Sequence, residues 1–416
     1  MGKRQSAMEG VEVKDRCILC KADSLQALLA IDKVPTSAQT LFMDHKESLE
    51  CDSASLNVVM CQKCSLIYNK AAFDFLPAVS PYDSKDYYYS VSFTQQSKEY
   101  QREIVKRISS FIDVSQKNVL EIGCGDGFFL NEISGFSAKA IGFEPSKTAA
   151  MAQQYKSIHV INDFFKPSTA EINITIHLYV LRHVLEHINR PIEFIKALSG
   201  LFQGESEIQN LFIEVPNTIH LLQNRMFFDL YYDHIFYFSD VSLSYLLRKA
   251  GWSDIVDIGD KDGEFLAVLS KSGIPQDFID DVESEKVIEY LNDMKSFLSQ
   301  FDRWKQKLLN VLKEIKDGGK RIAAWGAGSR GVSFITALSR EDFSFEYIVD
   351  TDPNKNMRYV PLTGTQVFTP DIIKRKPVDY ILITSYTYFD EICSLLKDDR
   401  KNGLKVIRLY PEIKII

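Results

Sequence analysis

The sequence has little of what membrane and secreted proteins require. It contains no uninterrupted apolar run that approaches the ~20 residues needed to span a bilayer. Its first residues, MGKRQSAMEGVEVKD, carry basic side chains but no apolar stretch, so they do not resemble a secretory signal. We therefore expect a cytoplasmic protein with no membrane partner.

Positive charge is also scarce. The 49 Lys and Arg residues are outnumbered by 56 Asp and Glu, which gives a formal net charge of −7 at pH 7. This balance argues against a general nucleic-acid-binding protein. Hydrophobic residues make up 45% and charged residues 25%, as in folded globular chains. Because 416 residues exceed one ordinary hydrophobic core, we expect two or three domains.

Cysteine is sparse, but four of the seven cysteines form two C-x-x-C pairs. In a reducing compartment such pairs favour a metal over disulfides. Four thiolates satisfy the tetrahedral preference of Zn²⁺ and leave no open position, which predicts a structural zinc site. The alternative is four unliganded cysteines. The candidate ligands, with 40 residues between the two pairs, are Cys17, Cys20, Cys61 and Cys64.

The order of apolar and polar segments predicts an α/β fold with three parts. Residues 1–95 are irregular, with short strand-like runs, both cysteine pairs and a tyrosine-rich stretch. Strands alternate with helices through residues 96–275, which is typical of a parallel, doubly wound, Rossmann-like sheet. Residues 276–416 begin with a helical bridge and continue with a second Rossmann-like series. We expect a monomer or a weak homo-oligomer.

A first glycine-rich loop follows the strand VLEI and opens a helix. Its glycines permit close approach of a ligand to the backbone beside a helix N-terminus. An acid ends each of the next two strands, where the first can accept hydrogen bonds from ribose hydroxyls and the second, with an aromatic neighbour, suits adenine. The candidate cofactor-binding residues are Glu121, Gly123, Gly125, Gly127, Glu144, Asp163 and Phe164.

These segments resemble the class I methyltransferases. The matching pieces are LEIGCGDG, GFEPS and NDFF, and the following LRHVLEHINRP is similar to the family's segment after its fourth strand. The resemblance implies that S-adenosylmethionine binds at this loop. The alternative is a nucleotide-type fold that has lost its ligand.

The order of parts over nearly the whole chain resembles a more specific family, the three-domain sugar C-methyltransferases. Their zinc-binding domain precedes a methyltransferase domain and a second nucleotide-fold domain, and they methylate a carbon of a nucleotide-linked 4-keto-deoxysugar. The strongest local matches are the cysteine pairs, YYDHIFYFS (231–239) and DTDPNKNMRYVP (350–361). The chain departs from the family at Asp233, where a Glu is usual, and at Asp262-Gly263-Glu264, where the family has small residues. These departures leave methylation of a sugar hydroxyl as an alternative.

The resemblance also implies catalytic residues. Methylation of a carbon next to a ketone requires a base, and histidine suits this role because its pKa lies near neutrality. His234 is the first candidate, from the family's Y-x-E-H motif, and His187 is the second. Hydrogen-bond donors to the sugar or the enolate are expected at Tyr231 and Tyr89, and Asp233 could orient an imidazole. We expect His183 to be structural.

A second loop, WGAGSRG (325–331), has the G-x-G-x-x-G spacing, and Asp350 ends the following strand. The motif alone predicts an NAD site and would make the protein an NAD-dependent reductase. The family resemblance instead implies contact with the diphosphate of a nucleotide-linked sugar. A purely structural loop is a third alternative, and a non-catalytic scaffold is a further alternative for the whole chain.

Overall fold

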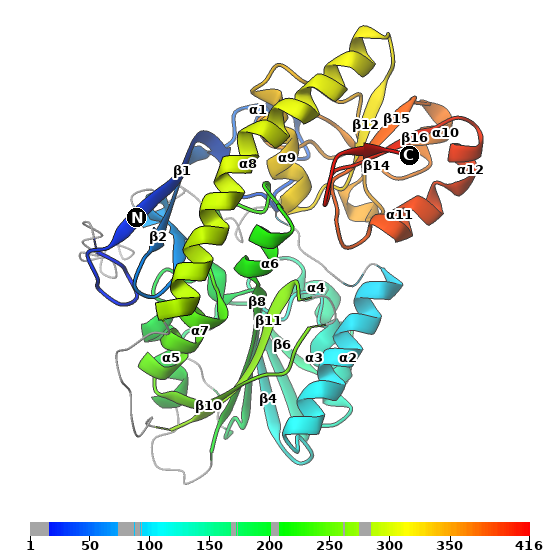
Figure 1. The fold of residues 1–416 in the computed structure, drawn as a ribbon. Helices are drawn as coiled ribbons and strands as arrows, with labels where there is room; N and C mark the ends of the chain where they lie inside the picture. Colours follow the sequence, from blue (N-terminus) through cyan, green and yellow to red (C-terminus); the bar gives the residue numbers. More distant parts are fainter. Residues whose placement is uncertain are drawn as a thin grey trace, which may run out of the picture.

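The computed structural model describes residues 16–73, 87, 92, 94–167, 172, 174–200, 208–260, 263–273 and 284–416. These residues form three β-sheets, and Figure 1 shows one sheet near the N-terminus, one in the middle of the chain and one near the C-terminus. Among the described residues, no helix is both long enough and apolar enough to cross a membrane.

The N-terminal sheet is antiparallel and has the strand order β1-β2-β3-β9. Its strands are β1 (Leu25–Pro35), β2 (Ser53–Cys61), β3 (Ile67–Asn69) and β9 (Phe236–Tyr237). A short helix α1 (His45–Leu49) joins β1 to β2, and η1 (Lys70–Phe73) follows β3. Because β9 belongs to residues 96–275, the N-terminal sheet takes one of its strands from the central part of the chain.

The central sheet has the strand order β10-β11-β8-β7-β4-β5-β6. The five strands from β8 to β6 are parallel, and β11 runs antiparallel to both of its neighbours. The strands are β4 (Asn118–Ile122), β5 (Lys139–Phe143), β6 (His159–Ile161), β7 (Leu178–Arg182), β8 (Asn210–Pro216), β10 (Trp252–Asp257) and β11 (Phe265–Ser272). The strand order reverses between β4 and β7, and the carboxyl ends of strands at such a point form the ligand crevice in open α/β sheets.

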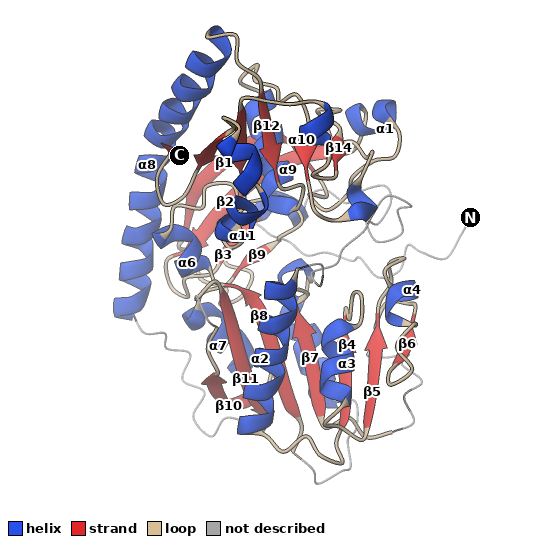
Figure 2. Ribbon diagram, turned by 90° about the vertical axis from the view of Figure 1, so that its right-hand side faces the viewer, coloured by secondary structure: helices blue, strands red, loops and turns tan. Residues whose placement is uncertain are grey.

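Helices cover both faces of this sheet. Figures 1 and 2 show α2 and α3 on one face and α5 and α7 on the other. The helices are α2 (Gln95–Phe111), α3 (Phe128–Ser134), α4 (Ala149–Ala152), η3 (Leu185–His187), α5 (Pro191–Gly200), α6 (Thr218–Gln223) and α7 (Asp240–Lys249). Local chemistry explains the start of α2, since the Thr94 side chain accepts a hydrogen bond from the Ser97 N–H. Ile104, Val105 and Ile108 then bury its apolar face.

The C-terminal sheet has the order β14-β13-β12-β15-β16-β17 and is parallel except for β17. Its strands are β12 (Ile322–Trp325), β13 (Ile348–Val349), β14 (Val367–Phe368), β15 (Tyr380–Ile383), β16 (Lys405–Arg408) and β17 (Lys414–Ile415). The helices are α8 (Ser284–Asp317), α9 (Ser329–Ser339), η4 (Pro353–Lys355), α10 (Ile372–Arg375), α11 (Phe389–Leu395) and α12 (Lys397–Lys401). The predicted α/β class with two Rossmann-like sheets is confirmed.

The bridge between the two Rossmann-like parts is the single long helix α8, which runs along the molecule in Figure 1. Phe227, which follows α6, packs against Phe297 and Trp304 of α8, with ring centroids 4.7 and 5.1 Å away. Arg330 of α9 also forms ion pairs with Asp229 and Glu264. These apolar and charged contacts hold the C-terminal sheet over the carboxyl ends of the central strands.

Candidate active site

A cavity of about 1020 Å³ lies between the central and C-terminal parts. Its central side is formed by loops after strands β4, β5 and β7, and its other side by the glycine loop after β12. The lining residues from the central part include Gly123, Glu144, Phe164, His183, Glu186, His187, Tyr231 and His234. Those from the C-terminal part include Gly326, Gly328, Ser329 and Asp350. A ligand in this cavity would therefore contact both Rossmann-like parts.

The first glycine loop needs its glycines for two different reasons. All three have positive φ angles of +72°, +54° and +77° at Gly123, Gly125 and Gly127. A Cβ atom at Gly123 would lie 2.5 Å from Val184 Cγ2, and one at Gly127 would lie 2.7 Å from Ala152 Cβ. At Gly125, by contrast, no described atom lies within 4 Å of the added Cβ. Gly123 and Gly127 thus allow close packing, whereas Gly125 leaves space that a ligand can occupy.

Glu144 stands at the end of β5 beside this space and is 7% exposed. Its Oε2 accepts a hydrogen bond from Gly125 N at 3.0 Å, and its Oε1 accepts one from Ser146 N at 2.9 Å. Two backbone donors therefore fix the carboxylate at the cavity wall. A carboxylate in this place, beside an open glycine, fits the ribose hydroxyls of S-adenosylmethionine.

The other predicted cofactor residues take different positions. Phe164 lines the cavity and is 37% exposed, which leaves a ring face for adenine. Asp163 is exposed, and its Oδ1 accepts a hydrogen bond from Phe164 N. Glu121 lies inside strand β4 with 2% exposure, and burial raises its pKa to about 8. The structure thus brings Gly123, Glu144 and Phe164 to the cavity and places Glu121 behind them.

The two predicted bases lie together. The ring centroids of His187 and His234 are 4.9 Å apart, and the Tyr231 hydroxyl lies 3.1 Å from His234 Nε2. His187 Nδ1 lies 2.6 Å from the backbone oxygen of Asp233. Because a carbonyl oxygen only accepts, Nδ1 carries the proton and the lone pair of His187 is on Nε2.

Burial sets the protonation of this group. It lowers the pKa of His187 to about 4 and the pKa of His234 well below its ordinary value, so both rings are neutral at neutral pH. Burial raises the pKa of Tyr231 well above 10, so its hydroxyl keeps its proton. The cavity therefore offers two imidazoles that can accept a proton and one phenol that can donate a hydrogen bond.

Asp233 acts through its backbone in this arrangement. Its carbonyl orients His187, as described above, whereas its Oδ1 has no hydrogen-bond partner among the described residues. Burial raises the pKa of its carboxyl group to about 7. The other predicted donor, Tyr89, lies outside the described residues.

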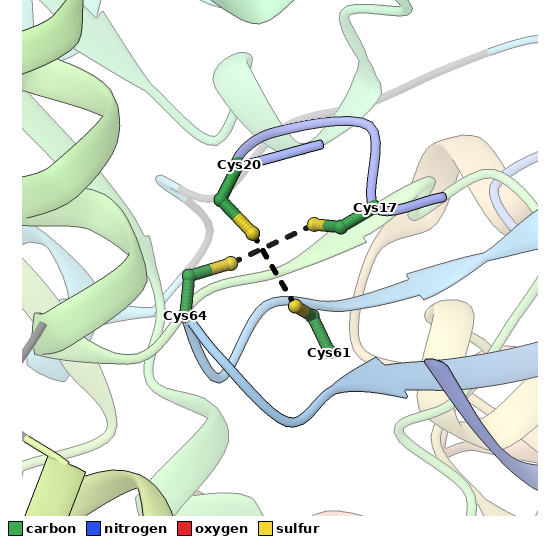
Figure 3. A group of neighbouring side chains, drawn as sticks. All are labelled: Cys17, Cys20, Cys61 and Cys64. Atoms are coloured by element: carbon green, nitrogen blue, oxygen red, sulfur yellow. Dashed lines mark hydrogen bonds between the residues drawn. The ribbon is translucent and has the colours of Figure 1, made fainter. Parts of the chain in front are cut away.

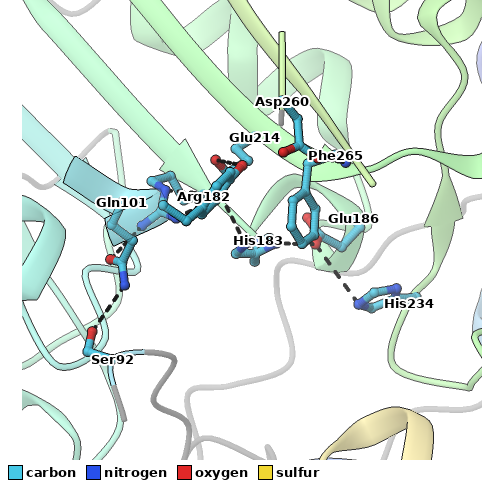
Figure 4. A network of polar contacts seen from close by, with 10 residues as sticks. Ser92, Gln101, Arg182, His183, Glu186, Glu214, His234, Asp260 and Phe265 are labelled. Atoms are coloured by element: carbon cyan, nitrogen blue, oxygen red, sulfur yellow. Dashed lines mark hydrogen bonds and ion pairs between the residues drawn. The ribbon is translucent and has the colours of Figure 1, made fainter. Parts of the chain in front are cut away.

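Sequence reasoning did not find a charged network at the wall of the cavity, where Tyr100, Arg182 and His183 line it. Figure 4 shows Arg182 at the end of β7 directed at Glu214, with 2.8 Å between Nη2 and Oε1. Glu214 also accepts a hydrogen bond from the Tyr100 hydroxyl at 2.9 Å and lies 3.0 Å from His183 Nε2. Burial alone would raise the pKa of Glu214, but Arg182 and His183 hold it at about 2.

His183, which the sequence analysis expected to be structural, lines the cavity and has a φ of +55°. This conformation is uncommon for a residue with a side chain and is often found at functional sites. A sequence signal was present in the spacing of H-V-L-E-H directly after a buried strand. Its direction toward the cavity depends on the local backbone, which the sequence does not reveal.

The second glycine loop faces the same cavity from the other side. A Cβ atom at Gly331 would lie 2.0 Å from the Gly326 oxygen, so this glycine serves tight packing of α9 on the loop. The Ser329 hydroxyl at the start of α9 is buried and has no hydrogen-bond partner among the described residues. Asp350 Oδ2 accepts hydrogen bonds from Ala327 N at 2.8 Å and Lys355 Nζ at 3.0 Å.

Away from the cavity, the four cysteines of the two pairs form one buried cluster (Figure 3). The Sγ–Sγ distances are 3.6 Å between Cys17 and Cys64 and 3.5 Å between Cys20 and Cys61, and all four sulfurs lie within 4.8 Å of one another. Four sulfurs placed tetrahedrally at about 2.3 Å from one ion would be ~3.8 Å apart. The cluster is thus of the size that holds one metal ion.

Comparison with known proteins identifies two domains of the chain. A methyltransferase domain model matches residues 93–256, and a model of the C-methyltransferase C-terminal domain matches residues 276–411. The chain is an S-adenosylmethionine-dependent methyltransferase, and its C-terminal domain is that of the C-methyltransferases. The predicted resemblance is therefore confirmed for the second and third parts of the chain.

A relative along the full length is C-methyltransferase NovU of Streptomyces niveus, which is 22% identical over 97% of each chain. Solved structures that are similar to part of the chain include two methyltransferases. Magnesium protoporphyrin IX methyltransferase of Synechocystis PCC 6803 with bound S-adenosylmethionine is 13% identical over 44% of this chain and 86% of that chain, with a TM-score of 0.33. An S-adenosylmethionine-dependent methyltransferase of Aquifex aeolicus is 15% identical over 42% of this chain and 90% of that chain, with the same TM-score of 0.33.

Proposed function

We propose that the enzyme methylates a carbon of a nucleotide-linked 4-keto-deoxysugar in deoxysugar biosynthesis. The observation that supports this most directly is that one cavity contains a cofactor loop, a neutral histidine pair and a second nucleotide-fold loop. The full-length similarity to a protein named as a C-methyltransferase supports carbon as the acceptor. A large two-sided cavity suits a substrate that has both a sugar and a nucleotide.

In this proposal Glu144 and the backbone around Gly123 and Gly125 hold S-adenosylmethionine, with Phe164 against the adenine. The bound cofactor supplies an electrophilic methyl group. His234 removes the proton from the carbon next to the ketone, and the Tyr231 hydroxyl donates a hydrogen bond to the developing oxyanion. His187, oriented by the Asp233 carbonyl, is the alternative base. The Tyr89 hydroxyl is a second hydrogen-bond donor to the sugar in this proposal.

The α9 loop is proposed to hold the diphosphate of the substrate. The backbone N–H groups at a helix N-terminus favour an anion, and the buried Ser329 hydroxyl supplies another donor at that point. An NAD-dependent reductase would use Asp350 for a ribose. That function is less well supported, because Asp350 is paired with Lys355 here.

The direct test is the product formed from a panel of nucleotide-linked keto sugars. We expect NMR to show a new methyl group on the carbon next to the ketone. The proton that this carbon loses should pass to the deuterated water. Replacing His234 with Ala should slow methyl transfer by about a hundred- to ten-thousand-fold and leave cofactor binding nearly unchanged. A methyl group on oxygen would contradict the proposal and establish the O-methyltransferase alternative. Tight NADH binding without S-adenosylmethionine binding would establish the reductase.

We also propose that the cysteine cluster binds one Zn²⁺, which stabilises a part of the chain with a small core of its own. Elemental analysis should find one zinc per chain, and Cys61→Ser should lose the zinc and unfold the N-terminal sheet or make the protein insoluble. A metal-free protein that is fully folded would contradict this proposal. The cytoplasmic location and the monomeric or weakly oligomeric state stay predictions.

A further inference from the structure

Glu186 has a buried carboxyl group at the cavity, and the proposed function gives this group no role. It lies in η3 with 0% exposure and lines the cavity. Neither of its carboxylate oxygens has a hydrogen-bond partner among the residues that the structure describes. A buried carboxylate without a partner is unfavourable, so its presence suggests that a positive charge forms near it during the reaction.

The surroundings of Glu186 show where this charge can form. Its Oε1 lies 3.9 Å from His234 Nε2 and 3.9 Å from His183 Nδ1, and Figure 4 shows both imidazoles directed toward the carboxylate. The other nitrogen of His183 is already held by Glu214 at 3.0 Å. Among the described residues, the titratable groups around Glu186 and its histidine neighbours are His183, His187, Glu214, Tyr231 and His234.

His234 requires such a neighbour. The burial that keeps its imidazole neutral also makes the imidazolium unfavourable, and a base that cannot hold a positive charge is a weak base. The neighbouring acid in the sequence, Asp233, binds His187 through its carbonyl. Within the part of the chain that the structure describes, the carboxylate at ion-pair distance from His234 is that of Glu186.

We propose that Glu186 is the counter-ion of His234, whose imidazolium forms when it takes the proton of the substrate. This inference rests on the proposed function. The C–H bond next to the ketone breaks, its electron pair becomes the enolate, and its proton joins the His234 ring. The enolate pair then forms a bond to the methyl carbon, and the electrons of the broken S–CH₃ bond stay on sulfur. His234 afterwards releases its proton to solvent. Glu186 is a positioning residue, because it acts through His234.

The proposal predicts a pH dependence. Burial raises the pKa of Glu186 to about 7, while His183 opposes this shift. Only the ionised form can pair with an imidazolium, so kcat/KM should rise as the pH increases through about 7. Replacing Glu186 with Gln removes the charge and should remove this limb of the profile.

The experiment is a double-mutant cycle on the full-length enzyme with the keto-sugar substrate. Glu186→Gln should lower kcat roughly ten- to a hundredfold, the usual size of a lost charged interaction, with little change in cofactor affinity. In the His234→Ala background the same substitution should have no further effect, because the charge that it balances no longer forms. The control is Glu193→Gln, the same change at an exposed position of α5, which should leave kcat and the pH profile unchanged.

Two results would overturn the inference: an unchanged rate and pH limb in Glu186→Gln, or a full additional loss in the His234→Ala background. If Glu186→Gln does not fold, Glu186→Asp keeps the charge and should retain the pH limb at a lower rate. The product of the wild-type enzyme separates this inference from the proposed function. Methylation of oxygen would contradict the proposed carbon methylation, whereas the double-mutant cycle would still show whether Glu186 acts through His234. The ¹³C carboxyl resonance of Glu186 can be assigned as the one that is missing from the spectrum of Glu186→Gln. In the wild-type enzyme without substrate, this resonance should titrate near pH 7. Titration at the value of an exposed glutamate would also contradict the inference.

Discussion

The two glycine loops of this chain follow the same local plan and serve different purposes. Each connects a buried strand to a helix, and each is followed by a strand that ends in an acid, Glu144 or Asp350. Glu144 is fixed by two backbone N–H groups beside an open glycine. Asp350 is also fixed by two backbone N–H groups, those of Ala327 and Asp352, but unlike Glu144 it is paired with a cation, Lys355. A glycine motif therefore predicts a loop shape, whereas the partners of the acid indicate which ligand the loop can hold.

Arg330 extends this comparison, because it lies inside the second G-x-G-x-x-G motif. It lines the cavity and forms ion pairs with Asp229 and Glu264 of the central part of the chain. The second loop is thus also a docking element, and the first loop has no equivalent arginine in its sequence. We expect the strongest stability effect at this residue.

Arg330→Ala should have the largest effect of the substitutions that compare the loops. It leaves two mostly buried carboxylates without their cation, and breaking such an ion pair costs about 3–5 kcal/mol. Chemical denaturation of the full chain should show this loss, with Arg303→Ala as a control at an exposed position of α8. A loss as small as that of the control would show that the interaction does not hold the two parts together.

The paired substitutions Glu144→Ala and Asp350→Ala sharpen the comparison directly. Removal of a charged hydrogen-bond acceptor costs about 1.5–3 kcal/mol, so Glu144→Ala should weaken S-adenosylmethionine binding about ten- to over a hundredfold. Asp350→Ala should leave that affinity nearly unchanged, because its carboxylate belongs to the other loop. Isothermal calorimetry measures both. Equal losses in the two variants would mean that the cofactor has been assigned to the wrong loop or to both loops.

The smallest effect is expected at Ser329. If its hydroxyl donates to the diphosphate of the substrate, Ser329→Ala removes one hydrogen bond worth roughly 0.5–1.5 kcal/mol net. The KM for the nucleotide-linked sugar should rise about two- to tenfold, while S-adenosylmethionine affinity stays the same. Steady-state kinetics with each substrate varied in turn separates the KM for the sugar from the KM for S-adenosylmethionine. A change in the KM for S-adenosylmethionine alone would contradict a diphosphate at α9.

The sequence by itself determined the order of the elements and most of the cofactor loop. Alternating apolar runs and glycines predicted both Rossmann-like sheets, because buried parallel strands and tight strand–helix turns need those residue types wherever they occur. The two C-x-x-C pairs predicted one cluster for a similar reason, since thiol groups at that spacing form two tight turns whose sulfurs can meet around one ion. Glu144 was predictable because its place at a strand end decides its environment.

Only the tertiary structure decided which side chains share the cavity and what charge each carries. Glu186 and His183 looked like ordinary residues of a common motif, and their proximity to His234 depends on how the segment around residue 234 folds back over β7. The sequence placed the carboxylate partner of the histidine at Asp233, whereas the backbone there turns the carbonyl toward His187. Contacts between distant segments depend on packing and burial, and burial in turn sets the pKa values of the acids and imidazoles. A local sequence pattern predicts neither these contacts nor these pKa values.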